Sequence, residues 1–185
     1  MNNFITERKN IADMNYKSKL HDIKAFVFDF DGVMTDGSVW MYADRETVRC
    51  GNIKDGFAIQ YAVKKDYVIA VISGATSLSI NNRMESLGVK QIYTGCANKM
   101  ETYLKFLELN GLSENEVLCM GDDIPDFDIM SHCGVAACPS DAAVEIKEIA
   151  DYISCYAGGR GCVRDVIEQV LRLQGKWFHA DAVNW

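Results

Sequence analysis

The chain has 185 residues, of which 49% are hydrophobic and 24% charged, a balance typical of a water-soluble globular domain with a sizeable core. A formal net charge of −7 makes nucleic acid and anionic membranes poor partners, although a local cationic site can still bind a small anion. No apolar run is long enough to span a bilayer, and the start of the chain lacks the apolar centre of a signal peptide. Seven cysteines without a Cys-x-x-Cys pair indicate reduced thiols and hence a cytoplasmic protein.

The first third of the chain predicts a leader, a strand, an insert and a helix. Residues 1–22 are polar and are interpreted as a leader or a short helix. The continuous apolar run at 24–30 is typical of a strand that is buried on both faces. A β-hairpin insert is expected at about 37–51, followed by a helix over 55–65 with Asp55 as its N-cap.

Strands and helices then alternate to the end of the domain. In chain order, beginning with a strand, the segments are 67–73, 77–88, 90–94, 98–111, 116–122, 124–134, 135–138, 142–150, 151–155 and 162–174. This alternation predicts an α/β fold, a Rossmann-like three-layer α/β/α sandwich with a mainly parallel sheet. The domain is expected to span 23–175, with a tail at 176–185 and no room for a large cap domain.

Acidic side chains follow two of the predicted strands, at the sheet edge where open α/β sheets bind ligands. Asp29 and Asp31 stand two positions apart and can share one face, while Asp122 and Asp123 follow a later strand. Carboxylates that are desolvated together repel each other unless a cation lies between them. Mg²⁺ is the usual cation when a phosphate supplies a further ligand.

A hydroxyl, a glycine and a lysine complete the candidate site. Ser73 and Gly74 end another strand, where a hydroxyl and free backbone N–H groups can bind phosphate. Lys99 begins a predicted helix and can act as a point charge for a phosphoryl group. Each residue alone fits an ordinary cap or a solvated side chain, so only their combination indicates a phosphate site.

These motifs resemble those of the haloacid dehalogenase superfamily. The segments "DFDGVMTDG", "VISG", the lysine of "NK" and "GDDIPD" have the order and spacing of its four motifs, and the resemblance extends from about Lys24 to Gln174. One departure is Ser73, where the superfamily commonly has threonine; the hydroxyl is retained. The resemblance implies a Mg²⁺-dependent phosphatase that works through an aspartyl phosphate.

The resemblance also implies a role for each matched residue. Asp29 is the implied nucleophile, and Asp31 is the implied general acid and base, whose backbone carbonyl joins the carboxylates of Asp29 and Asp122 on Mg²⁺. The implied phosphoryl-binding residues are Ser73, Gly74 and Lys99. Asp123 and Asp126 are expected to orient Lys99 or metal-bound water.

Further segments resemble one phosphatase family within this superfamily. "DGVMTDG", "KDGFAIQYA", "RMESLGV" and "AGGRGCVRDV" look like those of 3-deoxy-D-manno-octulosonate 8-phosphate phosphatases, which serve lipopolysaccharide precursor biosynthesis. That family implies Arg83 and Arg160 as substrate-binding residues, with Arg160 on a mobile glycine-rich loop. It also implies a homotetramer, in which apolar hairpin residues such as Val39, Trp40 and Met41 contact neighbouring subunits.

Three other interpretations remain open at the level of sequence. A phosphatase of a nine-carbon sugar acid 9-phosphate has nearly the same motifs, although "GGRG" favours the eight-carbon substrate. A phosphorylatable receiver domain also combines several aspartates, a hydroxyl and a lysine. Its phosphorylated aspartate, however, follows the third strand, whereas the Asp-x-Asp motif of this chain follows the first. A catalytically inactive regulatory domain is disfavoured, because every catalytic residue type is present.

Overall fold

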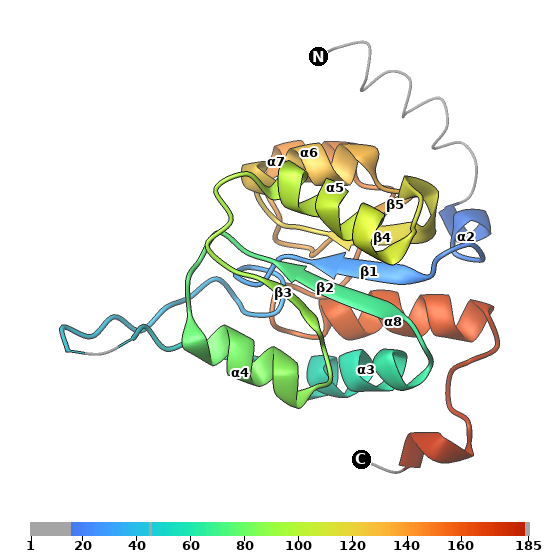
Figure 1. Cartoon of the computed structure of the whole chain (residues 1–185), viewed down its shortest axis with the longest axis horizontal. Helices are drawn as coiled ribbons and strands as arrows, with labels where there is room; N and C mark the ends of the chain where they lie inside the picture. Colours follow the sequence, from blue (N-terminus) through green and yellow to red (C-terminus); the bar gives the residue numbers. More distant parts are fainter. Residues whose placement is uncertain (1–15, 45, 184–185) are drawn as a thin grey trace.

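A computed structural model describes residues 16–44 and 46–183 (Figure 1). Most of the predicted leader, 1–15, lies outside the described residues, and its end forms the short helix α2 (Tyr16–Lys19). The core is a six-stranded sheet in the order β3-β2-β1-β4-β5-β6, and every neighbouring pair is parallel. The α/β/α sandwich predicted from the sequence is therefore confirmed.

Each predicted strand is present; the strand at 135–138 has its predicted bounds, and the other five are shorter than the segments that predicted them. The strands are β1 (Ala25–Phe28), β2 (Val68–Ile72), β3 (Gln91–Tyr93), β4 (Val117–Met120), β5 (Val135–Cys138) and β6 (Tyr152–Ile153). All residues of the adjacent strands β1 and β4 are buried, as expected for strands covered on both faces. The chain leaves the sheet before its polar residues, which places those residues in loops at the carboxyl edge.

Helices cover both faces of the sheet (Figure 1). One hydrophobic cluster joins the sheet to α3 (Ile53–Lys64), α4 (Leu78–Ser86) and α8 (Cys162–Leu173). A second cluster joins the opposite face to α5 (Lys99–Asn110), α6 (Phe127–His132) and α7 (Val144–Ile149). Short 3₁₀ turns occur at η1 (Glu114–Glu116), η2 (Ile124–Asp126) and η3 (Ala180–Val183).

The predicted hairpin is an extended arm rather than a regular pair of strands. Its two limbs are joined only by isolated antiparallel bridges, Thr35 with Gly51 and Trp40 with Val48, among the described residues. The arm projects from the body of the domain next to α4 (Figure 1). Its turn residues lack the strong Asn-Gly or Asp-Gly signal that fixes a tight two-residue hairpin. We refer to residues 37–51 as the arm.

Asp55 is not the N-cap of α3, contrary to the expectation from sequence. The helix begins two residues earlier, and Asn52 caps it by accepting a hydrogen bond from the Lys54 N–H group. Asp55 is instead buried and accepts a 2.7 Å hydrogen bond from the backbone N–H of Arg164, in the first turn of α8. One helix therefore supplies the cap of another, a tertiary contact that a local capping pattern does not reveal.

The C-terminal segment packs on α3 instead of hanging free. The Trp177 ring stands edge-on to Tyr61 with 5.4 Å between centroids, and the Arg164 guanidinium lies over the Trp177 ring. Lys65 forms a 2.7 Å ion pair with Asp181. None of the seven cysteines forms a disulfide, as the sequence predicted, and Cys119, Cys133 and Cys138 are buried. Among the described residues, none of the helices has the length and apolarity that crossing a membrane requires.

Candidate active site

The candidate site lies where the strand order reverses. β1 has β2 on one side and β4 on the other, and the chain leaves β1 and β4 toward the same edge of the sheet. Asp29 follows β1 directly, and its N–H still donates a 3.0 Å hydrogen bond to the Met120 carbonyl of β4. Such a switch point is the preferred ligand site of open α/β sheets. The fold thus brings the first and last acidic motifs together.

Lys99 connects these motifs electrostatically. Its Nζ atom lies 2.9 Å from Asp29 Oδ1 and 2.7 Å from Asp126 Oδ1, and the lysine side chain is only 8% exposed. Lys99 is the first residue of α5, which Asn98 caps through the Glu101 N–H group. Burial lowers the pKa of Lys99, but the charges and hydrogen bonds of the two aspartates outweigh burial and raise it above its ordinary value. The ammonium group therefore stays charged at neutral pH.

Three carboxylates gather around this lysine. Asp29, Asp122 and Asp126 each place one oxygen within 4.8 Å of the others. Burial, followed by the negative charge of Asp126, raises the pKa of Asp29 to about 7. Burial, followed by the charge of Asp29, raises the pKa of Asp122 to about 7. One lysine does not neutralise three carboxylates, so deprotonating all three aspartates is costly without a further cation.

The arrangement fits a divalent cation. Buried Oδ1 of Asp122 has no hydrogen-bond partner among the described residues, while Asp29 lies beside it with a carboxylate oxygen to share. Asp126 uses one oxygen for Lys99 and accepts a 3.2 Å hydrogen bond from the Asp122 N–H with the other. A Cβ atom at Gly32 would collide with the Asp122 carboxyl group, so the backbone approaches this carboxylate closely. Oxygen donors of this kind suit Mg²⁺.

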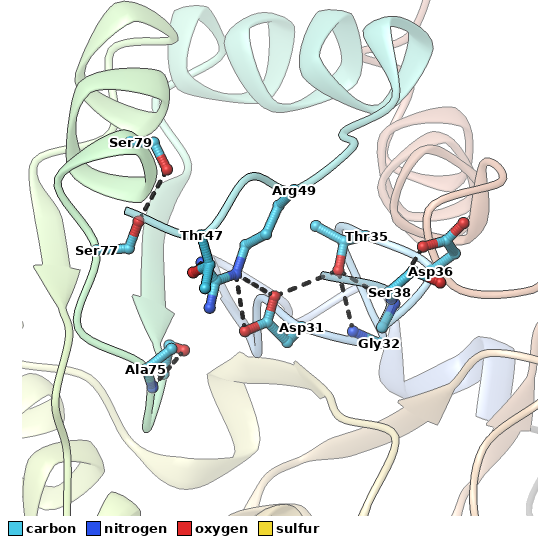
Figure 2. A network of polar contacts seen from close by, with 12 residues as sticks. Asp31, Gly32, Thr35, Asp36, Ser38, Thr47, Arg49, Ala75, Ser77 and Ser79 are labelled. Atoms are coloured by element: carbon cyan, nitrogen blue, oxygen red, sulfur yellow. Dashed lines mark hydrogen bonds and ion pairs between the residues drawn. The ribbon is translucent and has the colours of Figure 1, made fainter. Parts of the chain in front are cut away.

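Asp31 is oriented differently from Asp29. Its carboxylate accepts hydrogen bonds of 2.7 and 3.0 Å from Nε of Arg49, on the arm, and a 3.4 Å contact from the Thr35 hydroxyl (Figure 2). It is not a member of the group formed by Asp29 and Asp122. Sequence reasoning missed Arg49, because nothing in the arm's local pattern marks one of its charged residues as facing inward. The only available signal was that Arg49 carries a charge opposite to that of the acidic residues that follow the first strand.

Ser73 and Gly74 form a tight turn after β2. Ser73 is buried, and its hydroxyl oxygen accepts a 3.2 Å hydrogen bond from the Ala75 N–H, while its carbonyl accepts one from Cys96. The helix α4 starts only at Leu78, after Ser77, so Ser73 is not an N-cap. The local role of the Ser73 hydroxyl is therefore to stabilise this turn rather than to cap a helix. The turn is the third loop at the carboxyl edge of the central strands.

The remaining predicted residues lie apart from this carboxylate group. Asp123 is exposed and caps η2, accepting a 2.8 Å hydrogen bond from the Ile124 N–H. Arg83 is exposed on α4, with its guanidinium against Gly56 of α3. Arg160 forms a 3.1 Å ion pair with Asp36, and its side chain is 65% exposed. Of Asp123 and Asp126, the two acids expected to orient Lys99 or metal-bound water, only Asp126 contacts Lys99.

The glycine-rich loop is packed against the turn that follows β1, whereas the resemblance implied a mobile loop. A Cβ atom at Gly158 would collide with the carbonyl of Gly32, and one at Gly159 would meet the backbone of Thr35. The Gly159 N–H also donates a 2.9 Å hydrogen bond to the Val33 carbonyl. These glycines provide close backbone contact, and Arg160 is the side chain that projects from the loop.

Comparison with known proteins identifies related chains. Residues 78–163 match the family model of haloacid dehalogenase-like hydrolases. A 3-deoxy-D-manno-octulosonate 8-phosphate phosphatase of Escherichia coli is 33% identical over 159 residues, which cover 86% of this chain and 85% of that protein.

Solved structures agree with that similarity. A phosphatase of the same name from Yersinia pestis superposes with a TM-score of 0.86 at 29% identity, and the match covers 88% of each chain. Another from Moraxella catarrhalis, in complex with magnesium ion, phosphate ion and KDO, superposes with a TM-score of 0.85 at 26% identity. That match covers 89% of this chain and 95% of the other.

The raised pKa values of Asp29 and Asp122 predict how Mg²⁺ stabilises the fold. A carboxyl group with a folded pKa of about 7, against an ordinary 3.8, stabilises the protein at low pH and loses that contribution as pH rises through 7. We expect Mg²⁺ to raise the thermal unfolding midpoint more at about pH 8 than at about pH 5. Scanning calorimetry with Mg²⁺ or EDTA measures this, and an equal shift at both pH values would contradict it. The control is Asp122→Asn, in which the pH dependence of the shift should shrink.

Proposed function

The chain belongs to the haloacid dehalogenase-like hydrolases, within the family of 3-deoxy-D-manno-octulosonate 8-phosphate phosphatases. From this premise we propose that it is a Mg²⁺-dependent phosphatase that hydrolyses this sugar-acid phosphate. Its products are the free sugar acid, a precursor of lipopolysaccharide, and inorganic phosphate. The observation that carries the proposal is the contact of Lys99 with Asp29, beside the unpartnered carboxylate oxygen of Asp122, at the switch point of the sheet.

The proposed reaction begins with attack by Asp29. Its carboxylate oxygen bonds to phosphorus, the bond between phosphorus and the sugar oxygen breaks, and Asp31 transfers a proton to that oxygen. Lys99 holds Asp29 at 2.9 Å and can balance charge on the phosphoryl oxygens. Phosphoryl transfer depends mainly on such positioning and charge stabilisation. The product of this step is an aspartyl phosphate on Asp29.

Water completes the reaction. Asp31, now a carboxylate, takes a proton from a water molecule whose oxygen attacks phosphorus, and the bond between phosphorus and Asp29 breaks. The free Asp29 carboxylate returns to its contact with Lys99. Asp31 can serve both steps because it lies outside the three-carboxylate group, in an environment different from that of Asp29.

We assign the metal to the carboxylates of Asp29 and Asp122 and the backbone carbonyl of Asp31. When bound, Mg²⁺ neutralises the carboxylates and polarises the phosphoryl group. Asp126 acts on Lys99, which it contacts at 2.7 Å. The loop of Ser73 and Gly74 supplies hydrogen bonds for the phosphoryl oxygens. Asp123 is assigned to orienting Lys99 or metal-bound water from a greater distance. We assign the substrate's sugar acid to Arg83 and Arg160, whose guanidinium groups suit a carboxylate.

A phosphate-release screen tests the proposed activity. The wild-type enzyme with Mg²⁺ should hydrolyse the eight-carbon sugar-acid 8-phosphate with a higher kcat/KM than a nine-carbon sugar-acid 9-phosphate. Asp29→Asn should reduce turnover by roughly four orders of magnitude or more and abolish the covalent phosphoenzyme, because the nucleophile is lost. Asp66→Asn, at an exposed acid beyond α3, is the matched control and should retain activity. Full activity of Asp29→Asn contradicts the mechanism, and a preference for the nine-carbon ester contradicts the substrate.

Arg160→Ala tests the assignment of the substrate's sugar acid. We expect kcat/KM for the octulosonate phosphate to fall about 10- to 100-fold, in line with loss of a charged hydrogen bond. Turnover of p-nitrophenyl phosphate should change little, because this ester carries no carboxylate. Equal losses on both substrates would remove Arg160 from substrate recognition.

We also propose that the protein is a cytoplasmic homotetramer whose arms meet at the centre. The domain spans 23–175 with the arm as its insert, and the seven free thiols support a reducing compartment. The arm exposes several large apolar side chains, with Trp40 at 66% and Met41 at 81%. Contiguous apolar exposure of this kind is typical of a protein interface.

Sedimentation velocity tests the assembly. The wild-type protein should sediment as a species of four 20.7 kDa chains, and a double variant, Trp40→Ser with Met41→Ser, should shift toward smaller species. Leu109→Ser on α5 is a control with similar exposure, 73%, and should leave the assembly unchanged. A wild-type protein that is monomeric at assay concentration would contradict the proposal.

A further inference from the structure

Arg49 makes the principal polar contact of the Asp31 carboxylate. Its Nε atom lies 2.7 Å from Oδ1 and 3.0 Å from Oδ2, so one N–H group is shared between both oxygens. The arginine side chain is only 10% exposed although it comes from a projecting arm, and Asp31 is 29% exposed. Of the other described arm residues, only Thr47, the hydrogen-bond partner of Arg49, is likewise half-buried, so these two side chains turn inward together.

Several contacts fix the guanidinium group in place. Nη1 of Arg49 donates a 2.9 Å hydrogen bond to the Thr47 hydroxyl, which holds the plane of the group (Figure 2). Near the tip of the arm, Glu46 accepts a hydrogen bond from the Ser77 hydroxyl, in the cap of α4. At the base of the arm, the Asn52 amide donates a 3.2 Å hydrogen bond to the Gly159 carbonyl. The arm is therefore tied to the loops around the site on both sides of Arg49.

The opposite side of Asp31 is held more weakly. The Thr35 hydroxyl approaches Oδ1 at 3.4 Å, and the same hydroxyl oxygen accepts contacts from the N–H groups of Gly32 and Gly37. Without Arg49, the Asp31 side chain would keep only this long contact and would be free to change rotamer.

We propose that Arg49 is a positioning residue that fixes the Asp31 carboxylate for the step in which water attacks the phosphoenzyme. This inference rests on the proposed function. A guanidinium whose Nε–H points at both carboxylate oxygens, and whose Nη1 is held by Thr47, limits rotation of the Asp31 side chain, and the deprotonated carboxylate is the form that accepts the proton from water. The side-chain hydrogen bonds of Arg49 go to Asp31 and Thr47 and not to Asp29, so we assign its effect to Asp31. Losing Arg49 therefore slows breakdown of the aspartyl phosphate more than its formation from an activated ester.

p-Nitrophenyl phosphate separates the two steps, because its leaving group departs without a proton. In Arg49→Gln we expect phosphoenzyme formation from this ester to remain within a few-fold of wild type, while its hydrolysis slows roughly 10- to 100-fold. Rapid-quench kinetics should then show a burst of p-nitrophenolate that approaches one equivalent per subunit. The steady-state fraction of phosphorylated enzyme should rise above that of wild type. Arg49→Lys, which keeps the charge but loses the planar guanidinium that joins Asp31 to Thr47, should give an intermediate result.

Two controls distinguish this role from a structural one. Arg172→Gln removes an exposed arginine that pairs with Glu168 on α8 and should leave both steps unchanged. Binding of inorganic phosphate, measured by calorimetry, should be retained in Arg49→Gln, because Lys99 and Ser73 are untouched. If Arg49→Gln does not fold, the Arg49→Lys result decides.

The outcomes separate the inference from the proposed function. A phosphorylated fraction in the Arg49 variants equal to that of wild type overturns the role of Arg49, as does an equal loss of both steps. Absence of any phosphoenzyme and of turnover in the wild-type protein refutes the proposed function instead.

Discussion

The desolvation of like charges around Lys99 is the constraint on which the rest of the site depends. Asp29, Asp122 and Asp126 approach one another within 4.8 Å in a largely buried position, and among the described residues Lys99 is the one cation paired with Asp29 and Asp126. Such a group repels itself in water and more strongly in a protein interior. The fold holds it together because β1 and β4 are adjacent, all-buried strands that deliver their carboxyl ends to one point. The same repulsion provides the driving force for binding a divalent cation.

Asp29 and Asp31 each form an ion pair with a different basic residue. Lys99 serves the nucleophile from inside the domain, whereas Arg49 serves Asp31 from the arm. The two aspartates are only two positions apart in sequence, yet their cationic partners come from two separate segments, α5 and the arm. This separation suits the proposed roles, in which one carboxylate attacks phosphorus and the other transfers protons. Under that proposal the arm is part of the active site rather than only an insert.

The fold and the centre of the site could be predicted from the sequence because they depend on local pattern and strand order. Apolar runs gave six strands, and the rule that ligands bind at strand carboxyl ends placed Asp29 beside Asp122 and Lys99. Arg49 could not be predicted, since its orientation depends on how an irregular arm folds back over a loop eighteen residues earlier. Asp55 was misjudged for a related reason: its partner, the Arg164 N–H, is distant in sequence. Tertiary contacts of single polar groups carry no periodic signal.

The packing of the glycine-rich loop has a consequence for how the enzyme becomes active as it folds. The turn after Asp29 rests on Gly158 and Gly159, and the Cys162 thiol donates a 3.2 Å hydrogen bond to the Val33 carbonyl of that turn. These contacts join the first strand to the last helix across most of the chain length, so they close a long loop late in folding. A nascent chain that already contains all four motifs therefore lacks the support that shapes its catalytic turn. Activity is a property of the last helix as much as of the first strand.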